Sequence, residues 1–153
     1  CRRQRRDKDM NDISREEIES EMRRARSSLR SARLLSRASL AEDAISRACY
    51  AVLHAEKAAL LSEGVRTESH EAVRRLFGLH LIKTGKLDKK HAEILRREHE
   101  SRWLADYDVF YSPGMTHCRE RIEEAEEFLN AVADYLKAKG YSVEEGEENN
   151  ARA

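Results

Sequence analysis

The fold of this chain is organised around the stretch Ala44-Ile45-Ser46-Arg47-Ala48-Cys49-Tyr50-Ala51-Val52-Leu53-His54-Ala55-Glu56-Lys57-Ala58-Ala59-Leu60-Leu61. Apolar residues recur along it at helical spacing, and many of them are alanines. An inner helix face rich in alanine lets neighbouring helices approach closely. The pattern predicts a helix from about residue 40 to residue 62, ended by Gly64.

The segment before this stretch begins with a helix cap. Ser14-Arg15-Glu16-Glu17 has the capping-box pattern, in which a serine N-cap is followed three residues later by a glutamate. Behind the cap, apolar side chains follow one another at spacings of four, three, four and three residues. These residues predict a helix that ends near Arg37: Ile18, Met22, Ala25, Leu29 and Ala32.

Two helices are expected after the central stretch. The first begins at a cap formed by Thr67 or Ser69 and ends near Gly85, a residue type that suits the position after a last helical turn. The second begins at Leu87-Asp88 and stops before Pro113-Gly114, which breaks the chain.

A last helix, capped by Thr116 and ended by Gly140, completes the pattern. Short connections between long amphipathic helices favour antiparallel neighbours. We therefore expect an all-α, up-down antiparallel bundle of about five helices over residues 14–140. Residues 1–13 are basic and residues 141–153 are acidic, and both segments lack a core pattern and are expected to be disordered.

Composition limits the classes of function. A chain of 153 residues suits one domain, and its formal net charge of zero gives no global basic field for nucleic acid. No apolar run reaches the length of a membrane span and no signal peptide is evident, so we expect a cytoplasmic protein without membrane contact. The six histidines and three cysteines form no metal-ligand spacing, and no phosphate loop is present, so no metal or cofactor is expected.

Polar residues interrupt two of the predicted helix faces. Glu98, Arg102 and Asp106 share one face of the fourth helix, and Tyr107 lies slightly off it. On the central helix, three polar side chains are expected to face inward or nearly so: Arg47, Tyr50 and His54. Such groups can form an anion or nucleotide site, or they can be structural ion pairs that satisfy one another. Residue chemistry alone leaves both readings open.

Residues 44–61 resemble the second-helix signature of small HEPN-domain proteins (higher eukaryotes and prokaryotes nucleotide-binding). Three later pieces fit the same family in order: Ser69-His70-Glu71-Ala72-Val73, Phe77 through Lys83-Thr84-Gly85-Lys86-Leu87, and Arg102-Trp103-Leu104-Ala105-Asp106-Tyr107. The resemblance covers residues 14–140. It implies an all-α bundle that forms a homodimer and is encoded beside a minimal nucleotidyltransferase as a toxin–antitoxin pair.

The resemblance also implies a site. Active members of the family are metal-independent endoribonucleases that use an arginine and a histidine, and Arg102 matches the arginine. The histidine position is occupied by Tyr107, with Asp106 before it, and His54 or His99 are the candidate substitutes. The implied function is a toxin-like protein that acts on or binds RNA at a dimer cleft.

Two further consequences follow from the resemblance. A nucleotidyltransferase antitoxin can modify a tyrosine near the motif, and Tyr107 is the candidate here. The candidate catalytic residues are Arg102, Asp106 and Tyr107, and RNA or nucleotide would be bound by Arg47, Tyr50 and His54 of the central helix. Because the motif histidine is missing, the alternative is a non-catalytic module that binds nucleotide or a partner protein.

Overall fold

The computed structural model describes residues 13–67 and 69–143. Within them the chain forms five α-helices and one π-helical turn, and the described residues contain no strand: α2 (Arg15–Arg37), α3 (Ala41–Ser62), α4 (His70–Phe77), η1 (Gly78–Ile82), α5 (Lys90–Tyr107) and α6 (Met115–Ala138). The prediction of an all-α bundle is confirmed. Residues 1–12 and 144–153, most of the two predicted terminal segments, lie outside the described part of the chain.

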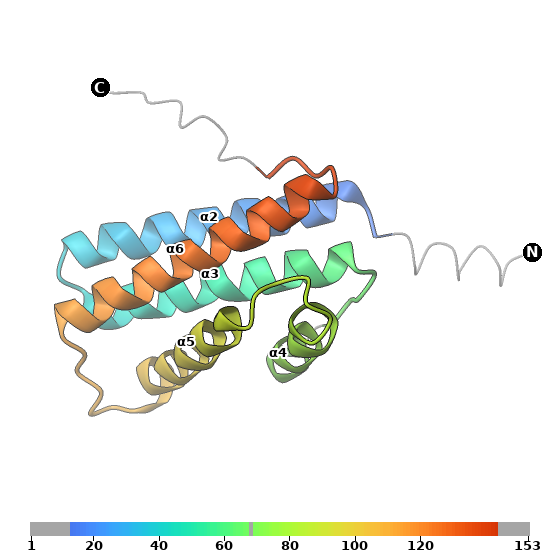
Figure 1. The fold of residues 1–153 in the computed structure, drawn as a ribbon. Coiled ribbons are helices and arrows are strands. Elements are labelled where there is room, and N and C mark those ends of the chain that lie inside the picture. Colours follow the sequence, from blue (N-terminus) through green and yellow to red (C-terminus); the bar gives the residue numbers. More distant parts are fainter. Residues whose placement is uncertain (1–12, 68, 144–153) are drawn as a thin grey trace, which may run out of the picture.

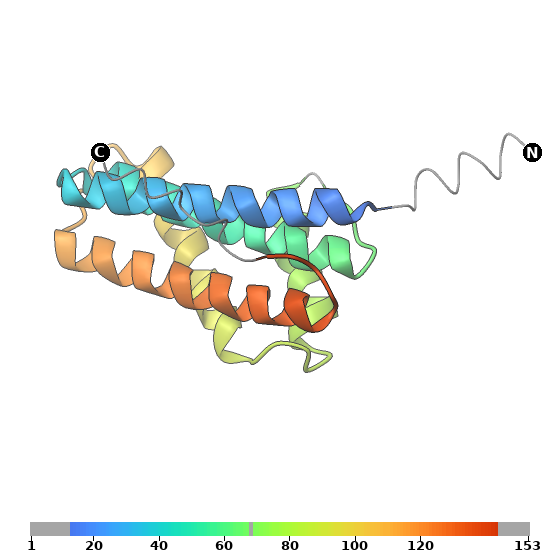
Figure 2. The same ribbon diagram turned by 90° about the horizontal axis from the view of Figure 1, so that it is seen from above.

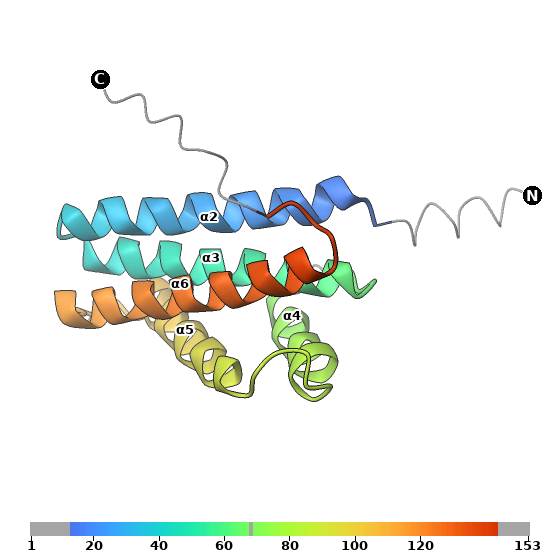
Figure 3. The same cartoon turned by 45° about the horizontal axis from the view of Figure 1, so that its top comes forward.

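The central stretch of the sequence is also the central helix of the molecule. α3 contacts all four other α-helices, and α4 and α5 lie on the side of α3 that faces away from α2 (Figures 1 and 3). Seen from above, α2 and α6 run side by side along its length (Figure 2). The small side chains that allow this packing are completely buried: Ala44, Ala48, Ala51, Ala55, Ala58 and Ala59.

α2 follows its sequence pattern closely. The Ser14 side chain accepts a hydrogen bond from the backbone N–H of Glu17 at 3.1 Å, which confirms the predicted cap. All five predicted stripe residues, from Ile18 to Ala32, are buried against the core. α2 and α3 are antiparallel neighbours, whereas α6 runs in the same direction as α3 because α4, η1 and α5 intervene (Figure 1).

The third predicted helix is divided into two parts. Ser69, not Thr67, is its cap, since the Ser69 side chain accepts a hydrogen bond from the backbone N–H of Ala72 at 3.3 Å. Beyond α4 the chain forms the π-helical turn η1, which is wider than an α-helical turn. Its hydrogen bond joins the N–H of Lys83 to the carbonyl of Gly78 at 2.9 Å. Gly85 then ends the segment with a φ of 74°, in the left-handed region that glycine adopts without strain.

The prediction that Thr116 caps the last helix is wrong. α6 begins at Met115, and the preceding Gly114 is the N-cap, with its carbonyl accepting from the N–H of Cys118 at 3.1 Å. Pro113 restricts the backbone just before this point, so the chain is already helical when it reaches Thr116.

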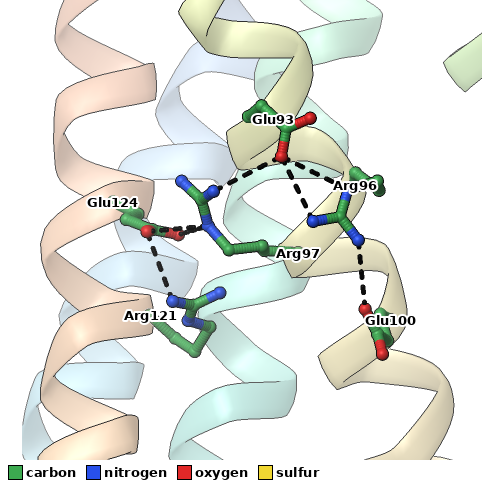
Figure 4. Close-up of polar contacts among 6 residues, drawn as sticks. All are labelled: Glu93, Arg96, Arg97, Glu100, Arg121 and Glu124. Atoms are coloured by element: carbon green, nitrogen blue, oxygen red, sulfur yellow. Dashed lines mark hydrogen bonds and ion pairs between the residues drawn. The ribbon is translucent and has the colours of Figure 1, made fainter.

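A network of ion pairs ties α5 to α6 (Figure 4). Arg97 Nε donates to Glu124 Oε1 at 3.0 Å, and Arg121 Nη2 donates to the same oxygen at 3.2 Å. Glu93 lies 3.5 Å from Arg97 Nη1 and extends the network along α5. Arg121 is only 6% exposed, so this ion pair offsets part of the cost of burying its charge. The network holds α5 against α6 and thereby sets the position of Arg102 on the next turns of α5.

Packing continues a little beyond the last helix. Tyr141 is half-buried against the core and Val143 is 4% exposed, so the ordered domain extends past the predicted boundary at Gly140. In the described part of the chain, no helix combines the length and the apolarity needed to cross a membrane.

Candidate functional site

A broad groove lies between α5 on one side and α4 with η1 on the other. Its volume is about 1130 Å³. The helices that form both walls lie on the same side of α3 (Figures 1 and 3). Twelve residues line it: His70, Glu71, Arg74, Arg75, Gly78, Leu79, Ile82, Lys83, His99, Arg102, Trp103 and Tyr107.

The groove concentrates positive charge in a chain that is neutral as a whole. Its lining holds four permanent cations against the single carboxylate of Glu71, a formal excess of three. Arg74, Arg75 and Lys83 make no salt bridge with any residue of the described chain, so their charges face the groove uncompensated. A surface of this kind attracts anions, and polyanions most of all.

Arg102 contacts side chains of three different helices beside the groove. Its Nη1 lies 2.5 Å from Nδ1 of His70, and its Nε lies 3.5 Å from Oδ2 of Asp106. The guanidinium also covers the ring of Tyr50 on α3, with 5.3 Å between the guanidinium carbon and the ring centroid. The Nε has no hydrogen-bond partner among the described residues, so Arg102 retains donor capacity.

His70 is neutral in this arrangement. Burial and the neighbouring Arg102 lower the pKa of His70 below its ordinary value of 6.5. Because an arginine can only donate, the close Arg102 contact assigns the acceptor role to Nδ1 and the proton to Nε2. His99, on the same groove, also has a lowered pKa, caused by burial and by the charges of Arg74 and Arg102.

The predicted residues of α5 lie together. Asp106 contacts Arg102 and also accepts a hydrogen bond from the Ser46 hydroxyl of α3 at 3.4 Å. Tyr107 lines the groove and is 69% exposed, with its ring centroid 6.0 Å from that of Trp103.

The three polar residues predicted to face inward from α3 lie in different surroundings. Both Arg102 and Arg47 lie over the ring of Tyr50. Arg47 is exposed, so the prediction that it faces inward is wrong. His54 does not line the groove, because its Nδ1 pairs with Oε2 of Glu21 on α2 at 2.7 Å.

Glu98 does not form the predicted row with Arg102 and Asp106. It is 2% exposed, and its partner is the Cys49 thiol, which donates to Oε2 at 3.1 Å. Burial raises the pKa of Glu98 to about 8, so the carboxyl is protonated near neutral pH. Glu56 of α3 is also buried, and burial raises its pKa to about 8.

Sequence reasoning missed the histidine that contacts Arg102. His70 begins α4, and 32 residues separate it from Arg102. Its local signals are its place beside the Ser69 cap and within the family piece from Ser69 to Val73, and neither predicts a contact with α5. Of the two substitutes proposed from the sequence, His99 lines the groove and His54 does not.

Comparison with known proteins agrees with this architecture. The model of the HEPN domain matches residues 18–138. A protein of Methanocaldococcus jannaschii named "Putative toxin MJ0605" is 32% identical over 84% of this chain and 95% of its own length. A "UPF0332 protein" of Thermotoga maritima is 32% identical over 78% of this chain and 91% of its own. A second Methanocaldococcus jannaschii protein, "Putative toxin MJ0142", is 27% identical over 90% of this chain and 92% of its own. The chain therefore belongs to the HEPN domain family.

Proposed function

We propose that this protein is the toxin-like component of a toxin–antitoxin pair, and that it binds and cleaves RNA in the groove between α5 and α4–η1. Membership of the HEPN family and the toxin names of two relatives support this proposal. The observation that carries it is the contact between Arg102 Nη1 and His70 Nδ1 at the wall of a positively charged groove.

The cations of the groove bind the RNA backbone. Arg74, Arg75 and Lys83 contribute uncompensated charge along one wall, and Arg102 faces them from the other. Phosphate contacts of this kind provide affinity that is independent of sequence and weakens with salt.

Arg102 and His70 then supply the chemistry. When Arg102 donates to the phosphate oxygens, Nδ1 of His70 is released and accepts the proton of the adjacent 2′-hydroxyl. The 2′-oxygen attacks phosphorus while Arg102 stabilises the added negative charge. The imidazolium returns the proton to the 5′-oxygen as the P–O5′ bond breaks, which leaves a 2′,3′-cyclic phosphate. Bonds and protons balance without any further reactant.

The test compares RNA cleavage by four purified proteins. Relative to wild type, His70→Ala should lose activity by roughly 10²- to 10⁴-fold, and Arg102→Ala by roughly 10²- to 10³-fold. Arg119→Ala is the matched control, because it removes an exposed arginine of α6 outside the groove. Equal cleavage by all four proteins, or none by wild type, would contradict the proposed activity.

Thermal or chemical unfolding of Arg102→Ala separates this proposal from a purely structural role. Asp106, the anionic partner of Arg102, has a side chain that is 31% exposed and can return to water when the arginine is removed. We therefore expect little loss of stability. A loss of several kcal/mol would favour the structural interpretation.

The second part of the proposal concerns the partner. We propose a nucleotidyltransferase antitoxin that transfers a nucleotide to Tyr107, whose ring is largely exposed beside the groove. Modification there would add negative charge and bulk where RNA binds. Intact-mass measurement after incubation with the neighbouring-gene enzyme and ATP should show one added nucleotide in wild type and none in Tyr107→Phe. Because both RNA and ATP are cytoplasmic, the proposal places the protein in the cytoplasm.

The third part concerns a homodimer. Val109 and Phe110 follow α5 and are 89% and 91% exposed, which is unusual for adjacent large apolar residues. We propose that they contact a second copy next to the groove. Without catalysis, the same surfaces would still make a nucleotide-binding or partner-binding module.

A further inference from the structure

The only tryptophan of the chain is exposed at the groove instead of buried in the core. Trp103 is 58% exposed and lies on α5 directly after Arg102. Its ring is tilted by 44° to that of Tyr107, so the two aromatic side chains form one apolar surface on the groove wall. An indole that is mostly exposed stabilises the fold less than a buried one, and exposed aromatic residues commonly bind a partner.

The size and charge of the groove indicate which kind of partner it binds. Its volume of about 1130 Å³ exceeds the range of roughly 300–1,000 Å³ that is usual for small-molecule pockets. The opposite wall carries three cations, Arg74 and Arg75 on α4 and Lys83 directly after η1. A row of cations suits a chain of phosphates better than a single phosphate or a neutral protein surface.

We infer that Trp103 is a stacking platform for one unpaired base, and that the groove therefore takes single-stranded RNA. This inference rests on the proposed function. Cations along one wall and an aromatic surface on the other form the combination that binds single strands, where the backbone follows the charge and the bases stack on rings. In an A-form duplex the base faces are covered by neighbouring bases, so the indole has no base to stack on.

Trp103 also reports on its own environment, because it is the only indole in the protein. We expect a single-stranded 2′-O-methyl oligonucleotide of about ten nucleotides to quench its fluorescence to saturation. The 2′-O-methyl groups remove the nucleophile, so binding is measured without cleavage. The same sequence as a duplex, and inorganic polyphosphate, should leave the fluorescence nearly unchanged.

Variants measure how much the ring contributes. Trp103→Leu should weaken binding of the labelled single strand by roughly 5- to 100-fold, whereas Trp103→Phe should retain most of the affinity because it keeps an aromatic face. Leu34→Ala is the matched control, since Leu34 lies on α2 outside the groove and is 56% exposed. Far-UV circular dichroism confirms that each variant is folded.

The outcomes separate this inference from the proposed function. If Trp103→Leu binds as tightly as wild type while Arg102→Ala does not, stacking is overturned and the RNA site stands. Equal affinity for duplex and single strand also overturns stacking. If no RNA binds at all, the proposed function fails and the inference fails with it. If the fluorescence of Trp103 changes with protein concentration alone and Trp103→Leu shifts the sedimentation from dimer to monomer, Trp103 is a contact between copies and the inference is wrong.

Discussion

Arg102 donates to His70, so His70 and a bound phosphate would compete for the same N–H groups of Arg102. While Arg102 donates to Nδ1, His70 has no free lone pair on that nitrogen. A phosphate that binds Arg102 would therefore also free the base. The resting contact keeps the imidazole neutral and oriented until the anion arrives.

The first prediction concerns the titration of His70. Because Arg102 lowers the pKa of His70, replacing it in Arg102→Gln should raise that pKa toward 6.5, although burial, the larger cause, remains. Histidine NMR titration of both proteins measures the change. Cleavage by wild type should be level above about pH 7 and should fall as the pH drops through the lowered pKa, since the protonated ring cannot act as a base. A pKa that falls in Arg102→Gln would contradict the assigned contact.

The second prediction concerns stability and Glu98. The folded-state pKa is about 8, whereas an unfolded glutamate titrates near ~4.3. Between these values unfolding releases a proton, so this residue makes the unfolding free energy fall as pH rises, by up to about 1.4 kcal/mol per pH unit. Glu98→Gln removes this dependence, and its stability relative to wild type should increase from about pH 5 to about pH 8.

Denaturant unfolding at several pH values measures the effect. Glu123→Gln on α6 is the control, because it neutralises an exposed carboxylate. A stability difference for Glu98→Gln that does not vary with pH would mean that Glu98 is ionised in the folded protein.

At the scale of elements, α3 supports every other helix and α4–η1 forms the wall of the groove. The alanines of α3 set how closely α2, α5 and α6 can pack. The π-helical turn contributes four lining residues in or directly after it: Gly78, Leu79, Ile82 and Lys83. Side chains presented there depend on the wider turn, so a regular α-helix would display a different face.

The third prediction tests the packing of α3. Ala55 is completely buried, so Ala55→Leu should lower the unfolding free energy by about 1–3 kcal/mol because the added methyl groups have no room. Ala92→Leu makes the same change at an exposed position of α5 and should stay within about 0.5 kcal/mol of wild type. Equal effects of the two substitutions in denaturant melts would show that α3 is loosely packed.

At the scale of the whole molecule, α4 and α5 lie on the same side of α3 (Figure 3), and residues of both line the groove. The segment that follows α5 presents Val109 and Phe110 to solvent, and the N–H of Phe110 is held by the Asp108 side chain at 2.9 Å. The groove and the apolar turn are thus adjacent along the chain. One assembly could use both, with RNA in the groove and a second copy beside it.

The fourth prediction tests that assembly. Wild type should sediment as a dimer, and the double variant Val109→Asp with Phe110→Ser should shift it to a monomer, because a charge and a polar group replace the apolar contact. Analytical ultracentrifugation over a range of concentrations measures this shift. Leu34→Ser changes another exposed apolar residue and should remain dimeric. A wild type that is monomeric at every concentration would disprove the dimer.

Much of the fold follows from local pattern. The Ser14 cap, the stripe of α2 and the alanine face of α3 are encoded by residues three or four apart, and the structure has them as expected. The predictions of helix ends were wrong where two local patterns compete. Thr116 is a good cap by residue type, but Pro113 and Gly114 start α6 before it. The π-helical turn has no periodicity that distinguishes it in advance.

The amino-acid sequence predicted an all-α protein and the places of its main helices, because helical periodicity is local. The family resemblance drew attention to Arg102. Only the tertiary structure brought His70 to Arg102, turned His54 toward Glu21 and left Arg47 exposed. It also gathered the cations of α4–η1 opposite Trp103. The physical reason is that these relations join residues of different helices, and they depend on how the helices pack across α3.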